Sequence, residues 1–135
     1  MIPMEKEKTT KNLLIVTAVI EAMIGLTLIV LPSAIASLLL GSALDTPGSL
    51  IVARVAGVAL TALGIACWIA NNNYKNDTSK GLVLAMTFYN MGVFIILLYA
   101  GTQLSLSGIG LWPAIITHLA MAFWCLISLF YRPGQ

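Results

Sequence analysis

Four long apolar segments divide the chain, and each is long enough to cross the hydrocarbon core of a membrane. They are Leu13–Leu31, Leu50–Ala70, Leu82–Ala100 and Leu111–Tyr131. A helix rises about 1.5 Å per residue, so roughly 20 apolar residues span a bilayer. None of the segments alternates apolar and polar residues with a period of two, which argues against a membrane β-barrel. The pattern predicts an all-α integral membrane four-helix bundle, built as a single transmembrane domain from residues 1–135.

A shorter apolar segment, residues 33–41, follows the first predicted span. Pro32 ends that span, because proline lacks the N–H that the helical hydrogen-bond ladder requires. The segment is too short to cross the membrane and closes at Gly41. We therefore expect a short interfacial or re-entrant helix on the outer face.

The composition supports a membrane location and excludes several classes of protein. Hydrophobic residues make up 59% of the chain and charged residues only 9%, with a mean hydropathy of +0.96. A soluble domain normally carries about 25% charged residues. A soluble enzyme, a nucleic-acid-binding protein and a disordered protein are thereby excluded. The net charge of +2 is too small to indicate a polyanionic partner, and the lipid bilayer is the partner that the composition predicts.

The positive residues predict an orientation. Lysine and arginine residues outside the spans occur in the two termini and the middle loop: Lys6, Lys8, Lys11, Lys75, Lys80 and Arg132. The first and third loops contain neither residue type. Because positive loops stay on the cytoplasmic side, both termini should be cytoplasmic in a bacterial inner membrane. The basic start and the sequence Ala34-Ile35-Ala36 also resemble a signal peptide, but the long apolar stretch, interrupted by Glu21, favours a retained span.

Small residues recur along the second span in two ladders. One is Ala53-Gly57-Thr61-Gly64 and the other is Ala59-Ala62-Ala66-Ala70. Small residues at three- and four-residue spacing let helices approach closely in lipid. The ladders predict tight packing of the second helix, either inside the bundle or between two copies of a homodimer.

Polar residues within the spans are the candidate site. Glu21, Arg54 and His118 are ionisable, and Tyr89 and Asn90 accompany them. A central charged residue costs at least about 2.5 kcal/mol on insertion scales. These five side chains should therefore face the bundle interior and find partners there.

Two interpretations of this polar cluster remain open. In one it is a pocket open toward the outer leaflet, in which Arg54 holds an anionic head group and Glu21 and His118 exchange a proton. In the other it is a structural network, with Glu21–Arg54 as a buried salt bridge. Both interpretations place the same residues together.

The chain contains no recognisable cofactor or metal motif. It lacks a CxxC pair, a paired-histidine spacing, a phosphate loop and a dinucleotide fingerprint. No catalytic residue and no metal ligand is predicted, and the identity of any cofactor is left open. Cys67 and Cys125 both fall toward the inner end of their helices, where a reducing compartment disfavours a disulfide.

Several short motifs resemble those of small bacterial four-helix membrane proteins of the DoxX-like kind. The residues that carry the resemblance are Glu21 with Gly25, Leu31-Pro32, Leu38-Leu39-Leu40-Gly41, Arg54-Val55-Ala56-Gly57, Leu63-Gly64 with Trp68, Tyr89-Asn90, and Trp112-Pro113 before His118. The likeness extends over most of the chain and implies the four-helix fold. Some DoxX-like proteins are linked to quinone or thiol redox systems. This chain lacks an outer-face cysteine pair, which argues against a thiol role.

These observations leave three functional hypotheses. The first is a binding or accessory membrane protein that holds a lipid, quinone or other small amphiphile, or that stabilises a larger membrane complex. The second is a proton-coupled small-molecule transporter acting as a homodimer, because four helices rarely line a passage alone. The third is a quinone-linked redox subunit, for which His118, Tyr89 and Glu21 are plausible proton-transfer groups. The redox enzyme is the least favoured of the three hypotheses, since no cofactor motif supports it.

Overall fold

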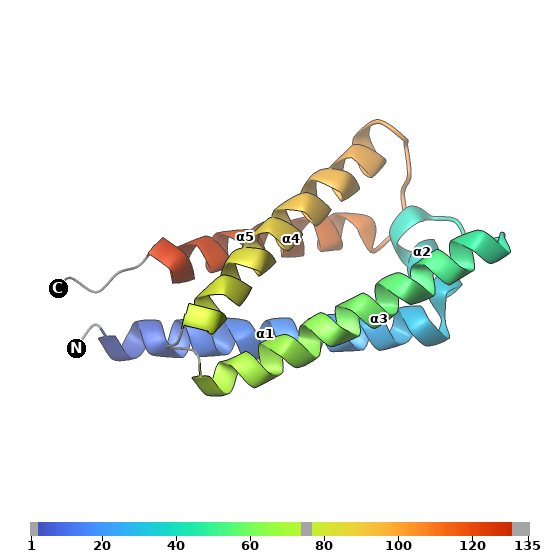
Figure 1. Ribbon diagram of the computed structural model, residues 1–135. Coiled ribbons are helices and arrows are strands. Elements are labelled where there is room, and N and C mark those ends of the chain that lie inside the picture. The colour runs from blue at the N-terminus through green and yellow to red at the C-terminus, as the bar shows by residue number, and fades with distance from the viewer. Residues whose placement is uncertain (1–2, 74–76, 131–135) are drawn as a thin grey trace.

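The protein is an all-helical bundle, as predicted (Figure 1). The computed structural model describes residues 3–73 and 77–130. In these residues the elements are α1 (Pro3–Val30), α2 (Pro32–Leu40), α3 (Pro47–Ala70), the 3-10 turn η1 (Asn71–Asn73), α4 (Asp77–Thr102) and α5 (Leu111–Phe130). Helices α1, α3, α4 and α5 are each long and apolar enough to cross a membrane. The chain is thus a multi-pass membrane protein.

Three of the spanning helices begin before the apolar segments that predicted them. Helix α1 begins at Pro3, α3 at Pro47 and α4 at Asp77. A polar cap holds the start of α3, where the Thr46 side chain accepts from the Ser49 amide at 3.1 Å. Hydropathy marks only the part of a helix that is apolar, so it cannot find such ends. The predicted end at Tyr131, and the predicted cytoplasmic Lys75 and Arg132, lie outside the described residues.

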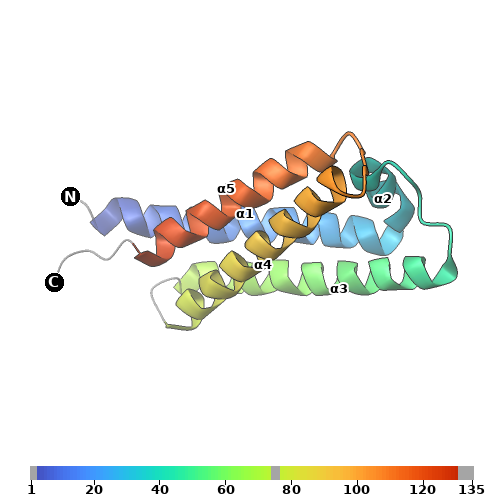
Figure 2. The same ribbon diagram turned by 90° about the horizontal axis from the view of Figure 1, so that it is seen from above.

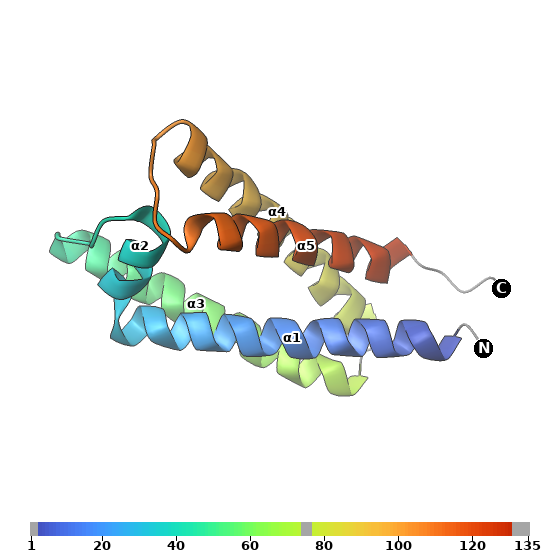
Figure 3. The same ribbon diagram turned by 180° about the vertical axis from the view of Figure 1, so that it is seen from behind.

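The short helix expected after the first span is α2. Pro32 occupies its first turn, and Gly41 ends it with a φ of 78°, a left-handed conformation that favours glycine. Helix α2 packs against α1, α3 and α5. It lies at the end of the bundle opposite the start of α1 and the end of α5 (Figures 1 and 3).

The loop between α4 and α5 is hydrogen-bonded to the end of α2. The Gly108 amide donates to the Leu39 carbonyl at 3.2 Å, and the Gly110 amide donates to the Leu38 carbonyl at 2.8 Å. These are carbonyls that a helix end otherwise leaves without partners. A Cβ on Gly108 would lie 2.2 Å from the Leu38 carbonyl oxygen, so this contact requires glycine.

Helices α1 and α3 approach each other through small residues. A Cβ on Gly25 would lie 2.6 Å from the Thr61 backbone nitrogen, and one on Gly57 would lie 2.6 Å from the Gly25 carbonyl oxygen. A Cβ on Gly64 would lie 2.9 Å from the Ala18 carbonyl oxygen, which is also closer than real Cβ atoms approach. The first of the two predicted ladders therefore packs inside the bundle, against α1.

Of the second predicted ladder, by contrast, only Ala70 packs against the apolar core of the bundle. Ala59, Ala62 and Ala66 are exposed on the outside of α3. Helix α3 is thus tightly packed along one side only.

Helices α4 and α5 form a second pair, and α4 inclines away from α1 and α3 toward the α2 end (Figures 1 and 2). Near the opposite end, all four long helices meet in one apolar core. Its buried members are Leu13, Leu14, Ala18, Cys67, Val83, Met86, Met121 and Cys125. Both cysteines are free and fully buried there.

The α1–α3 contact leads to a prediction about stability. Replacing Gly25 with alanine should lower the free energy of unfolding by about 1–3 kcal/mol, because the new Cβ meets backbone atoms of α3 that cannot move independently. Gly92→Ala is the matched control, since a Cβ at Gly92 meets nothing within 4 Å. Thermal unfolding in detergent measures both variants. A Gly25→Ala protein as stable as the Gly92→Ala protein would contradict the glycine contact.

Candidate functional site

Four of the five predicted polar residues come together in the middle of the bundle. Helix α1 contributes Glu21, α4 contributes Tyr89 and Asn90, and α5 contributes His118. The Tyr89 hydroxyl donates to Glu21 Oε2 at 3.1 Å. Glu21 is 4% exposed, so this hydrogen bond joins α1 to α4 in the bundle interior.

A second hydrogen bond joins α4 to α5. Asn90 Nδ2 donates to the Met86 carbonyl at 2.8 Å, which orients the amide so that Oδ1 faces His118. His118 Nδ1 lies 2.9 Å from that oxygen. Because an amide oxygen only accepts, Nδ1 carries the hydrogen of this bond. In the neutral form of the ring, Nε2 is then an acceptor.

Ring packing connects the two hydrogen bonds. The Tyr89 and His118 rings meet edge to face, with centroids 5.8 Å apart and planes at 78°. Glu21, Tyr89, His118 and Asn90 therefore form one continuous polar network across three helices.

Arg54, the fifth predicted residue, does not belong to this network. Its side chain is exposed, and Nε donates to the Ile29 carbonyl at 3.2 Å. That carbonyl is one of the last in α1, and Pro32 interrupts the helix before the Ser33 amide reaches it. Arg54 instead caps the end of α1, so the salt bridge with Glu21 that the sequence suggested is not formed.

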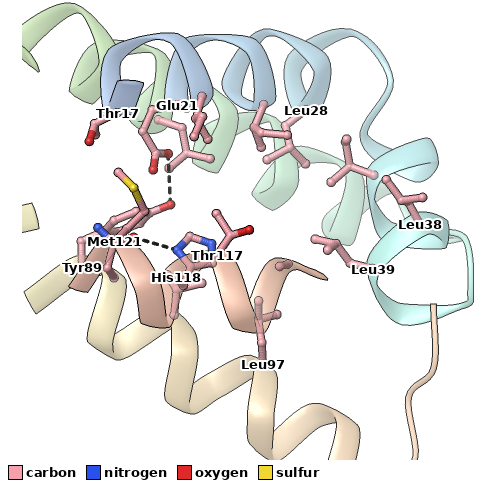
Figure 4. Close-up of a pocket in the computed structure, with 17 residues that line it drawn as sticks. Thr17, Glu21, Leu28, Leu38, Leu39, Tyr89, Leu97, Thr117, His118 and Met121 are labelled. Atoms are coloured by element: carbon pink, nitrogen blue, oxygen red, sulfur yellow. Dashed lines mark hydrogen bonds between the residues drawn. The ribbon is translucent and has the colours of Figure 1, made fainter. Parts of the chain in front are cut away.

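A cavity of about 380 Å³ adjoins the polar network (Figure 4). Most of the lining is aliphatic, with polar groups from α1, α4 and α5: Thr17, Ile20, Glu21, Ile24, Leu28, Ile35, Leu38, Leu39, Leu60, Tyr89, Asn90, Val93, Leu97, Ala114, Thr117, His118 and Met121. Glu21, Tyr89 and His118 lie together at one end, and Leu28, Leu38 and Leu39 lie at the other. The cavity has a polar end and an apolar end.

The hydroxyl of Thr17, at the edge of the cavity, differs from those of other threonines in the described helices. Threonines in the described helices commonly donate to the carbonyl four residues earlier, as Thr27, Thr61, Thr87, Thr102 and Thr117 do. Thr17 is 1% exposed, and its hydroxyl has no hydrogen-bond partner within residues 3–73 and 77–130. A buried hydroxyl without a partner carries a free-energy cost that water or a ligand would relieve.

The sequence did not predict that α2 contributes residues to this site. The apolar end of the cavity is closed by Ile35, Leu38 and Leu39. In the sequence these residues belong to an ordinary apolar segment. Thr17 had a recoverable signal, because it lies four residues before Glu21 and shares its helix face. The sequence contains no comparable signal for where α2 packs, since its position depends on the loop that follows α4.

The described residues do not bring together three His, Cys, Asp or Glu side chains as a metal site would require. The chain matches no protein-family model, curated protein or solved structure in the comparisons made with it.

The Tyr89–Glu21 hydrogen bond leads to a second prediction about stability. Tyr89→Phe removes only the hydroxyl, and we expect it to lower the free energy of unfolding by about 0.6 kcal/mol and by no more than about 1.7 kcal/mol, the range for hydrogen bonds between membrane helices. Tyr99→Phe is the control, because Tyr99 is an exposed tyrosine of the same helix. Equilibrium unfolding in detergent compares the two. Equal stabilities would show that the bond does not join α1 to α4.

Proposed function

We propose that this protein is a binding or accessory membrane protein that holds a small amphiphile within the bundle. One observation carries the proposal: a single cavity has a hydrogen-bonding network at one end and aliphatic side chains at the other. An amphiphile has the same division, with a polar head and an apolar body. A network with a purely structural role would not need the adjoining space.

The size of the cavity limits what it can hold. Ligand pockets span about 300–1,000 Å³, and this one, at about 380 Å³, lies at the small end. It suits a single-chain lipid, a quinone head group or another small amphiphile rather than a whole two-chain phospholipid.

A transporter and a redox subunit are the alternative functions for the same residues. The buried Glu21 carboxyl beside a cavity is the feature that favours proton-coupled transport by a homodimer. The adjoining Tyr89 and His118 rings are the feature that favours quinone chemistry. Both alternatives require that the cavity bind a small molecule, so binding is the first property to test. A DoxX-like relationship stays a hypothesis and assigns no role to any residue.

Native mass spectrometry of the detergent-purified protein tests the proposal. We expect a stoichiometric small molecule to accompany the parent protein and to be lost from His118→Ala, because that change removes one side of the polar end. Arg54→Ala is the matched control and should keep the ligand, since Arg54 lies outside the cavity lining. The spectrum also reports the oligomeric state.

The outcomes of this experiment are distinct. A bare protein mass in all three samples would contradict the proposal. Loss of the ligand from Arg54→Ala but not from His118→Ala would place binding elsewhere in the bundle.

We also propose a bacterial inner-membrane location with both termini in the cytoplasm. The start of α1, the end of α3, the start of α4 and the end of α5 lie at one end of the bundle, and α2 lies at the other (Figures 1 and 3). Lys8, Lys11 and Lys80 belong to the first of these ends. The loops beside α2, residues 41–46 and 103–110, contain no lysine or arginine. Under the positive-inside rule, the α2 end faces outward.

Cysteine labelling on intact cells tests this orientation. A membrane-impermeant maleimide should label Ser42→Cys, which lies in the exposed loop after α2, and should label Asn12→Cys only after lysis. The parent protein is the control, because Cys67 and Cys125 are fully buried and should stay unlabelled. The reverse pattern would invert the topology, and labelling of both sites on intact cells would indicate dual orientation.

A further inference from the structure

The hydrogen bonds at the polar end of the cavity leave acceptors unused. Tyr89 occupies only one oxygen of Glu21, and no described residue donates to Oε1. Asn90 occupies only Nδ1 of His118, and within the described part of the chain Nε2 has no partner. Both residues line the same end of the cavity, so two acceptors remain for whatever enters it (Figure 4).

The donors that remain at this end carry no charge. The Tyr89 hydroxyl hydrogen is directed to Glu21, and the Thr117 hydroxyl donates to the Pro113 carbonyl. The Thr17 hydroxyl and the second hydrogen on Asn90 Nδ2 remain. Among the residues that the structure describes, no lysine or arginine lines the cavity. An anionic head group would therefore meet the Glu21 carboxyl without a compensating positive charge, which is costly in an apolar interior.

We infer that the ligand held in this cavity has a primary ammonium head group on a single aliphatic chain. Such a head group donates hydrogen bonds and carries a positive charge. This inference rests on the proposed binding function and specifies its ligand class. The ammonium N–H groups donate to Glu21 Oε1 and His118 Nε2, and the carboxylate supplies the opposite charge. The chain lies along Leu28, Leu38 and Leu39 toward α2.

The position of Arg54 strengthens the assignment. An arginine within the network would neutralise Glu21 and prepare the site for phosphate or carboxylate groups. Its guanidinium instead hydrogen-bonds the end of α1 through Nε, so the Glu21 carboxyl keeps its preference for a cation.

Matched amphiphiles with the same chain and different head groups test the inference. Decylamine, decanol and decanoate are titrated separately into the protein in a neutral detergent at neutral pH, with binding measured by native mass spectrometry. We expect the Kd for decylamine to be at least about tenfold lower than that for decanoate, a difference of about 1.4 kcal/mol. Decanol, which donates one hydrogen bond without charge, should fall between them.

Variants assign the preference to the cavity. Glu21→Gln keeps the size of the side chain and removes its charge, so the preference for decylamine over decanoate should disappear. Asp45→Asn removes an acidic group from an exposed loop and changes the net charge equally, so the preference should remain. His118→Phe keeps a ring but removes Nε2. It should weaken decylamine binding several-fold and have little effect on decanoate binding. If Glu21→Gln does not fold, His118→Phe still tests the assignment.

The results separate this inference from the proposed function. Decanoate binding as tightly as decylamine, or a preference that survives in both Glu21→Gln and His118→Phe, would overturn the ammonium assignment while the binding cavity stands. Failure of all three amphiphiles to bind the parent protein would overturn both.

Discussion

Helices in lipid gain little from burying apolar surface against one another, so their association depends on close packing and on interhelical hydrogen bonds. In this protein the closest packing is between α1 and α3, where Gly25 and Gly57 bring the two backbones together. That contact occupies one side of α1. Glu21, one turn before Gly25, lies toward the other helix pair, where Tyr89 reaches it. Helix α1 is thus joined to α3 by close packing and to α4 by a hydrogen bond.

The cavity follows from the same arrangement. Helices α4 and α5 join α1 and α3 in an apolar core near one end and diverge toward the other, where α2 packs between them. Pro32 makes this possible by ending α1 and starting a new helix, and Gly108 allows the α4–α5 loop to reach the carbonyls of α2. A continuous first helix would leave that end of the cavity without Ile35, Leu38 and Leu39.

The chemistry of the site is determined by which polar groups are already paired. Hydrogen bonds within the bundle use one oxygen of Glu21 and one nitrogen of His118, and both side chains line the cavity. Among the described residues, the second oxygen and the second nitrogen have no partner. Arg54 is diverted by the helix break, because the Ile29 carbonyl needs a donor that Pro32 prevents the backbone from supplying. The positive charge of Arg54 therefore lies outside the cavity lining.

The sequence by itself determined the fold class, the four spans and the short helix after the first of them, because hydropathy and proline act over short distances along the chain. It also singled out Glu21, Tyr89, Asn90 and His118, since polar groups in lipid must find partners. Only the tertiary structure decided which partners they find, that Arg54 is not among them, and that α2 closes a cavity. These outcomes depend on how far each helix rotates and tilts against its neighbours, which the side chains of several distant segments set together.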